Sequence, residues 1–149
     1  MDDLLQRWDD LQGPIVRVEQ AAPAPPAAVH EAWLDPARLR EWWWPMWPDT
    51  TYEIDPRVGG RYRIHSAAAD FGVSGTYLYL GREDAPEIWM TWNWSADGPG
   101  EGPEELVRVR FDPQETFGTN VVMEHKLADP DADTTNPTQG WTDVMARLA

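Results

Sequence analysis

The sequence predicts an α+β fold in which a curved antiparallel sheet of about seven strands wraps round a C-terminal helix. Three observations lead to this prediction. Segments with the period of a helix lie near both ends of the chain and after Pro26. Between residues 51 and 127 the apolar residues instead alternate with polar ones, as in half-buried strands joined by turns. The last helix carries an apolar stripe that only a sheet is large enough to bury.

The composition indicates a single acidic domain that contains no thiol groups. The chain has 149 residues, no Cys and one composition throughout, which indicates a single domain. A formal net charge of −14 repels phosphates and anionic lipid headgroups, so we expect neither nucleic acid nor a membrane as a partner. The absence of Cys and of a signal-peptide pattern predicts a cytoplasmic location. A preference for Arg over Lys, with frequent Ala and Pro, is typical of a GC-rich bacterial source.

The first 20 residues predict an amphipathic helix followed by a strand. Gly13-Pro14 ends the helix, and residues 15–20 alternate as a strand does. The apolar residues of the helix recur at the spacing of one helix face: Leu4, Leu5, Trp8 and Leu11.

A helical corner follows, and it ends in a run of indoles. Pro26 is favourable in the first turn of one helix, and Asp35-Pro36 supplies the N-cap and first turn of a second. The second helix leads into Glu41-Trp42-Trp43-Trp44-Pro45-Met46-Trp47, which holds four of the ten tryptophans of the chain. Pro45 stops the helix there.

Two interpretations of this tryptophan run remain open. Either most of the indoles wedge the corner against the edge of the sheet, or one or two of them line a cavity entrance and stack on a planar ligand. Trp43 is the foremost candidate for the second role. Three consecutive tryptophans of a helix cannot all point inward, so the three should differ in role. We therefore expect Trp43→Ala to alter ligand affinity, and Trp42→Ala and Trp44→Ala to alter mainly stability.

From residue 51 onward, apolar residues tend to recur at every second position, as they do in β-strands. Near the middle of this region, Trp92 and Trp94 fall on the face expected to be buried and Trp89 on the other. The faces of the segment 73–80 stay ambiguous, since large residues occupy both. Strands are predicted at 51–55, 61–65, 73–80, 87–94, 106–111 and 117–127, with a turn at 59–60 and a Gly/Pro/acid-rich loop at 95–105.

The last helix is predicted to begin with Asn136 as the N-cap, Pro137 at the first helical position and Gln139 at the third. Its apolar residues must be buried against the sheet, and the space between such a helix and such a sheet is commonly a cavity. They lie on one helix face: Trp141, Val144, Met145 and Leu148.

Several segments, in this order, resemble the START-like helix-grip superfamily, also called SRPBCC, and within it the branch similar to Hsp90-ATPase-activator homologues (AHSA1-like). The matching segments are Pro26-Ala27-Ala28-Val29-His30-Glu31-Ala32-Trp33, Asp35-Pro36, Trp43-Trp44-Pro45, Asp55-Pro56-Arg57-Val58-Gly59-Gly60-Arg61-Tyr62, Gly75-Thr76-Tyr77, Met90-Thr91-Trp92 and Gly140-Trp141.

The resemblance implies a seven-stranded antiparallel sheet that grips the C-terminal helix, with a pocket for hydrophobic or amphipathic ligands between them. We expect residues 14–149 to form a single START-like domain and residues 1–13 to form an additional amphipathic helix. The final helix is shorter than in relatives, which predicts a more open end of the pocket. Functions in the superfamily extend from lipid and polyketide binding to cyclase chemistry and co-chaperone work, so the family does not select one.

His125 is the candidate acid/base of the chain. It occupies the apolar phase of its strand, where an inward His is more often a satisfied core residue than a catalyst. His65 falls on the outward phase and His30 on a helix, so a three-His metal site is not supported. Gly59-Gly60 lacks the Lys-Ser/Thr and helix of a phosphate loop, and we expect no metal and no cofactor.

The first functional hypothesis is binding of a small hydrophobic, aromatic or polyketide-like ligand between sheet and helix. An amine-bearing ligand attracted by the negative field is a less favoured variant. The predicted ligand-binding residues are Trp43, Tyr62, Met90, Trp92, Trp94, Met123, Trp141 and Met145.

Two further hypotheses come from other classes. In one, the same cavity belongs to a cyclase or dehydratase of natural-product biosynthesis that uses His125 for proton transfer. In the other, the protein is an interaction module of the co-chaperone kind, which uses the N-terminal helix or the outward Trp89 as a contact. The N-terminal helix could also dock a second copy of the chain in a homodimer.

Overall fold

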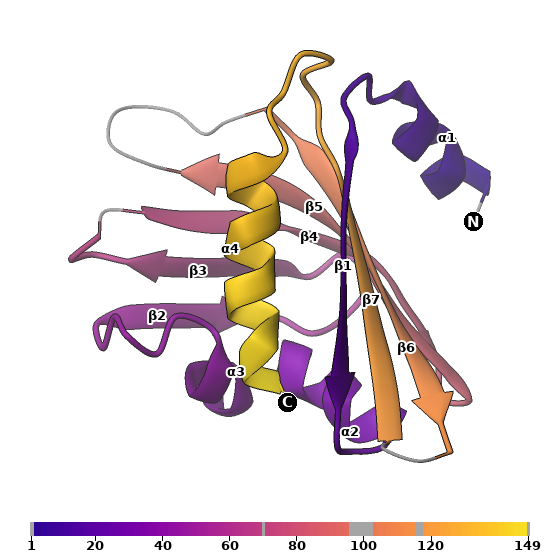
Figure 1. Ribbon diagram of the computed structural model, residues 1–149, viewed down its shortest axis with the longest axis vertical. Helices are drawn as coiled ribbons and strands as arrows, with labels where there is room; N and C mark the ends of the chain where they lie inside the picture. Colours follow the sequence, from indigo (N-terminus) through magenta and orange to yellow (C-terminus); the bar gives the residue numbers. More distant parts are fainter. Residues whose placement is uncertain (1, 70, 96–102, 116–117, 149) are drawn as a thin grey trace.

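A computed structural model describes residues 2–69, 71–95, 103–115 and 118–148. It confirms the predicted α+β fold. Seven strands form one antiparallel sheet in the order β1-β7-β6-β5-β4-β3-β2, and helix α4 lies across its concave side (Figure 1). The chain runs α1 (Asp2–Asp10), β1 (Ile15–Ala22), α2 (Pro26–Leu34), α3 (Pro36–Trp42), β2 (Thr50–Ile54), β3 (Arg61–Ser66), β4 (Phe71–Arg82), β5 (Ala85–Ser95), β6 (Glu105–Gln114), β7 (Gly118–Lys126), α4 (Thr135–Met145) and a 3₁₀ turn, η1 (Ala146–Leu148).

The strand register decides which residues face α4. His125 of β7 pairs with Val16 of β1 on one side and with Val107 of β6 on the other, and all three are at most 1% exposed. Because successive residues of a strand point to opposite faces, their neighbours Arg17, Arg108 and Glu124 lie on the outer face. The inner face is therefore the apolar one.

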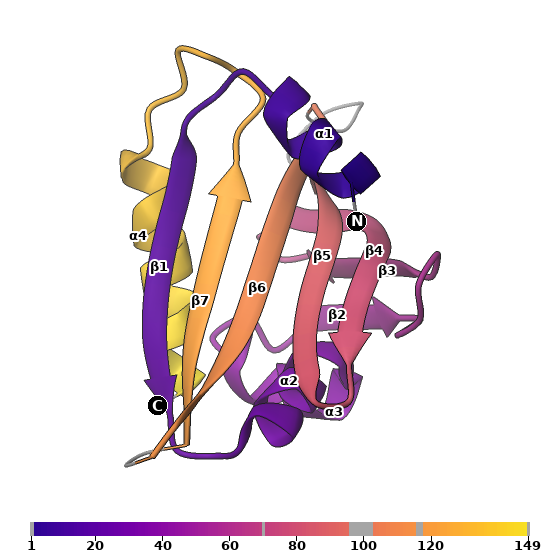
Figure 2. The ribbon, with the colours of Figure 1, turned by 90° about the vertical axis from the view of Figure 1, so that its right-hand side faces the viewer.

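The helical corner forms as predicted. Pro26 begins α2, and the side chain of Asp35 caps α3 by accepting a hydrogen bond from the backbone N–H of Ala37 at 2.9 Å. Trp42 closes the corner, since its Nε1–H donates to the carbonyl of Ala32 at 3.0 Å and its ring packs on Trp33. α2 and α3 thereby cover one end of the sheet (Figure 2).

Three local expectations need correction. The helix α4 begins at Thr135, and the cap residue Thr134 makes no side-chain hydrogen bond, so the predicted Asn136 cap is wrong. Asp133 instead accepts a hydrogen bond from the backbone N–H of Thr135 at 2.8 Å.

Strand β4 continues through Gly81, where a positive φ of 81° accommodates an irregularity in the pairing with β5. Strand β6 begins at Glu105, which was expected in the loop; residues 96–102 of that loop lie outside the described residues.

Helix α1 lies on the outer face of the sheet, over one end of β5 and β6 (Figure 2). The ring of Trp8 meets Trp89 edge-on at 5.6 Å, and the guanidinium of Arg108 lies over the same indole at 5.3 Å. Arg7 pairs with Glu104 at 2.7 Å. Trp89 is thus on the outer face, as predicted, but only 1% exposed.

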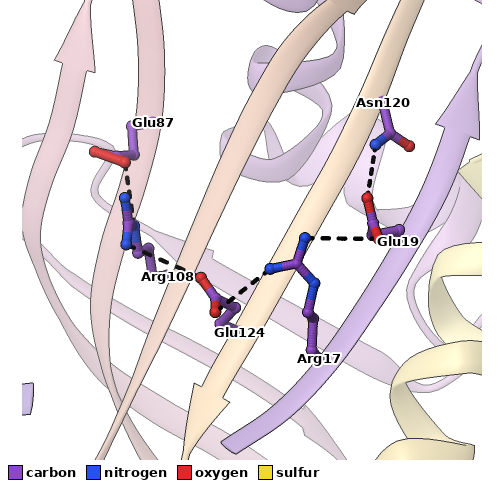
Figure 3. A network of polar contacts seen from close by, with 6 residues as sticks. All are labelled: Arg17, Glu19, Glu87, Arg108, Asn120 and Glu124. Carbon is purple, nitrogen blue, oxygen red and sulfur yellow. Dashed lines mark hydrogen bonds and ion pairs between the residues drawn. The ribbon is translucent and has the colours of Figure 1, made fainter.

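Across β5, β6, β7 and β1 the outer face carries a ladder of alternating charges (Figure 3). Arg108 contacts Glu87 and Glu124 at 3.3 and 3.9 Å, and Arg17 contacts Glu124 and Glu19 at 3.7 and 3.6 Å. Arg17 and Glu19 are about half exposed, whereas Arg108, Glu87 and Glu124 are partly buried. Ion pairs at a surface contribute about 0–1 kcal/mol each. This part of the outer face is charged, and the apolar pocket lies on the opposite face of the sheet.

Candidate functional site

A pocket of about 460 Å³ lies between α4 and an aromatic wall. The wall comes from the segment after α3 and from the ends of β4 and β5 that lie beside it. The opposite side is one face of α4 and η1. The lining residues are Trp43, Trp44, Met46, Trp47, Phe71, Trp92, Trp94, Asn136, Pro137, Gly140, Trp141, Asp143, Val144 and Arg147. The pocket tryptophans are therefore six of the ten in the chain: Trp43, Trp44, Trp47, Trp92, Trp94 and Trp141.

The tryptophan run divides at the end of α3. Trp42 remains in the helix and faces the corner, whereas Trp43 and Trp44 turn toward the pocket. Trp44 has a φ of 52°, in the left-handed region that costs a bulky residue about 1–2 kcal/mol. Its ring contacts Trp43, Trp47 and Phe71, and these contacts offset the backbone cost. Trp44, expected to serve mainly stability, is thus also a wall residue.

The aromatic wall is continuous. Phe71 meets Trp44 at 5.4 Å and stacks on Trp94 at 5.0 Å with an interplanar angle of 27°. Trp94 meets Trp92 edge-on at 5.0 Å, and Trp92 meets Trp141 of α4 at 4.9 Å. The chain of ring contacts therefore passes from the corner segment through the sheet to the helix.

Two indoles of the wall have unused hydrogen-bond donors. Nε1–H of Trp43 and of Trp92 has no partner among the described residues, although the two side chains are only 3% and 1% exposed. A buried donor without a partner costs roughly 1–3 kcal/mol. Both nitrogens are shielded from solvent, so a molecule in the pocket would reach them only if an indole ring turned.

Trp141, His125 and Glu105 form a hydrogen-bond relay next to the pocket. Trp141 Nε1–H donates to His125 Nδ1 at 3.1 Å, so Nδ1 is the unprotonated nitrogen, because an indole N–H can only donate. His125 Nε2–H then donates to Glu105 Oε1 at 2.8 Å, and the other oxygen of Glu105 accepts the backbone N–H of Ala128 at 2.9 Å. His125 is 0% exposed and both of its ring nitrogens are engaged.

The structure brings four of the eight predicted ligand-binding residues together in the pocket: Trp43, Trp92, Trp94 and Trp141. The other four, Tyr62, Met90, Met123 and Met145, are buried in the core and do not line it. Tyr62 is held there by its O–H, which donates to the carbonyl of Thr91 at 2.6 Å. Burial raises the pKa of Tyr62 well above its usual value and raises that of the neighbouring Tyr77, so both phenols stay protonated near neutral pH.

Several site residues were not predicted from the sequence. Glu105 had a usable signal, because extending the alternation of Val107, Val109 and Phe111 back by two residues places it on the inner face. Gly140 had a weaker one, as a glycine within a predicted helix. The other lining residues had no usable signal, because their place in the pocket depends on the three-dimensional path of the corner and of α4. They are Trp44, Met46, Trp47, Phe71, Asn136, Pro137, Asp143, Val144 and Arg147.

The described residues hold no group of three His, Asp or Glu side chains arranged to bind a metal ion. None of the described helices is long and apolar enough to cross a membrane. The polar groups of the pocket lie along α4 and η1, where Asn136, Asp143 and Arg147 flank the apolar strip.

One known protein family matches most of this chain. The model of a family described as activator of Hsp90 ATPase homolog 1-like protein matches residues 23–149. That range covers the domain from the end of β1 onward and leaves out α1. A comparison with curated proteins finds no match.

Solved structures show the same fold at low identity. A protein from Rhizobium leguminosarum is 25% identical with a TM-score of 0.72, over 91% of each chain. DynU16, from the dynemicin biosynthetic locus, is 21% identical with a TM-score of 0.72; the match covers 91% of this chain and 45% of DynU16. An HSP90 activator from Plasmodium falciparum is 18% identical with a TM-score of 0.63, over 89% of this chain and 91% of the activator.

Proposed function

Since this chain belongs to the family of activator of Hsp90 ATPase homolog 1-like proteins, whose matching segment contains the whole pocket, we propose that it binds a small aromatic molecule between α4 and the sheet. The observation that carries the proposal is the pocket wall. Six indoles and one phenyl ring surround a space of about 460 Å³, which is within the usual range of about 300–1,000 Å³ for small-molecule sites.

The chemistry of this wall favours aromatic over aliphatic ligands. Ring faces and edges contribute about 0.5–1.5 kcal/mol per aromatic pair beyond the burial of apolar area. The polar side chains that the pocket offers to a ligand lie on α4 and η1. Asn136, Asp143 and Arg147 would contact its polar edge.

A cyclase or dehydratase reaction through His125 is the less favoured alternative. His125 does not line the pocket and contacts two residues that do, Trp92 and Trp141. To exchange a proton with a molecule in the pocket, its ring would have to give up a hydrogen bond to Glu105 or Trp141. The likeness to DynU16 concerns the fold and does not carry this alternative further.

A protein-interaction role remains the alternative from another class. The outer face is its natural location, because α1 lies there and is outside the segment that matches the family. Trp89, however, is covered by Trp8 and Arg108, so it would become available only if α1 moved away. A cytoplasmic location and a homodimer through α1 stay predictions from the sequence.

Trp94→Leu and Trp8→Leu form a matched pair that tests ligand binding. Both indoles are half-buried, but Trp94 lines the pocket and Trp8 lies on the outer face. For anthraquinone-2-sulfonate, a planar probe with acceptor oxygens, we expect Trp94→Leu to weaken binding about 5- to 30-fold through lost aromatic contact. Trp8→Leu should leave affinity unchanged. Isothermal titration calorimetry measures both.

The proposal would be contradicted in two ways. One is a wild-type protein that binds neither the planar probe nor an aliphatic one such as decanoate. The other is a loss of affinity that is equal in Trp94→Leu and Trp8→Leu, since binding would then follow overall stability rather than the pocket wall.

A further inference from the structure

Gly140 is the least expected residue of α4. It lies in the middle of the helix Thr135–Met145, where glycine is less stable than alanine because it loses more backbone freedom on folding. Close packing does not explain it, because a Cβ placed at Gly140 would meet nothing within 4 Å in the described structure. The neighbouring sheet and corner thus leave open space in front of this residue.

Gly140 is exposed, so that open space is the solvent-facing part of the pocket. Gly140 is a lining residue, and Pro137 and Val144, one turn before and after it, line the pocket from the same strip of the helix. At Gly140 the backbone of α4 is therefore itself part of the pocket wall. Facing this strip is the aromatic wall, where Phe71 stacks on Trp94 and both belong to the lining.

We propose that the ligand is a planar polycyclic aromatic molecule whose ring face lies against the α4 backbone at Gly140. A flat ring can approach a helix backbone closely only where no Cβ stands between them. Residue 140 then determines how thick a molecule the pocket accepts, and the helix keeps glycine there at a cost in stability. The inference rests on the proposed function, because it places the ligand within the same pocket.

The chain offers a direct test at this position. Gly140→Ala and Gly140→Leu fill the open space to different extents, while Thr138→Leu adds the same leucine at an exposed residue of α4 that does not line the pocket. The probes are anthraquinone-2-sulfonate, which is planar and rigid, and decanoate, whose chain can bend round a side chain. Affinity is measured by isothermal titration calorimetry, and folding by the melting temperature without probe.

We expect Gly140→Ala to raise the melting temperature by about 1–4 °C, as removal of a mid-helix glycine should. It should weaken anthraquinone-2-sulfonate binding roughly 2- to 5-fold, and Gly140→Leu should weaken it at least 30-fold. Thr138→Leu should bind like the wild type. Decanoate should lose much less affinity than the planar probe in Gly140→Leu.

Two results would overturn the inference, and they can be told apart. If the wild type binds the planar probe and Gly140→Leu, still folded, binds it equally well, the ligand does not cross Gly140 and only this placement fails. If the wild type binds neither probe, the proposed function fails and the placement fails with it.

Discussion

Replacing Glu105 with alanine is expected to lower the free energy of unfolding by about 2–4 kcal/mol, because the change removes the acceptor of two hydrogen bonds, one of them from a fully buried donor. Glu105 is 7% exposed, and its carboxylate accepts hydrogen bonds from His125 Nε2–H and from the backbone N–H of Ala128. Without it, the fully buried Nε2–H of His125 has no partner, and the part-buried N–H of Ala128 loses its acceptor. Urea denaturation followed by far-UV circular dichroism measures the loss.

The adjacent Glu104 is the matched control for Glu105. Its side chain is 56% exposed and forms one ion pair with Arg7, so Glu104→Ala should cost less than about 1 kcal/mol. Glu105→Gln should fall between the two, because its amide can accept from His125 but presents an N–H₂ to Ala128. Equal effects of Glu104→Ala and Glu105→Ala would show that the relay does not hold the sheet to α4.

Trp141→Ala is expected to remove both stability and binding. Trp141 is 4% exposed, stacks on Trp33 at 6.1 Å, and anchors α4 to the sheet through His125. Truncating a buried indole costs about 3–5 kcal/mol, and here it also removes part of the pocket wall. We therefore expect a loss of that size in urea denaturation and at least a 100-fold weaker affinity for anthraquinone-2-sulfonate.

Trp141→Phe separates packing from hydrogen bonding. Phenylalanine keeps an aromatic ring in the pocket but cannot donate to His125 Nδ1, so we expect a loss of about 1–3 kcal/mol with binding largely retained. If Trp141→Phe were as damaging as Trp141→Ala, the hydrogen bond rather than the ring would support the site. If Trp141→Ala left affinity intact, the pocket described for this protein would not be the binding site.

The fold could be predicted from the sequence because its signals are local. The period of two from residue 51 onward, the Asp35-Pro36 cap and the apolar stripe of the last helix each follow from a few neighbouring residues. Where a prediction failed, a competing local contact was the cause. Asp133 supplies the hydrogen bond expected from an Asn136 cap, and the positive φ of Gly81 lets β4 continue through a residue that was expected to end it.

The site could be predicted only in part. The alternation of residues along β5 placed Trp92 and Trp94 on the correct face of the sheet. It does not show at which point along the sheet a space remains between sheet and helix. Met123 and Met145 share the predicted faces and lie in solid core, whereas Trp44 reaches the pocket through a left-handed backbone that no period reveals. The relay partner of His125 was missed because the start of β6 was read as loop.

The indole N–H signals of the ten tryptophans provide the most direct test of the central claim, that the pocket between α4 and the aromatic wall binds an aromatic ligand. Each indole gives one peak in a ¹H–¹⁵N correlation spectrum, and anthraquinone-2-sulfonate can be titrated against all of them together. The account predicts saturable shifts of the pocket tryptophans, with Trp8 and Trp89 on the outer face unmoved. Shifts at Trp8 and Trp89, or none at the pocket tryptophans, would contradict it.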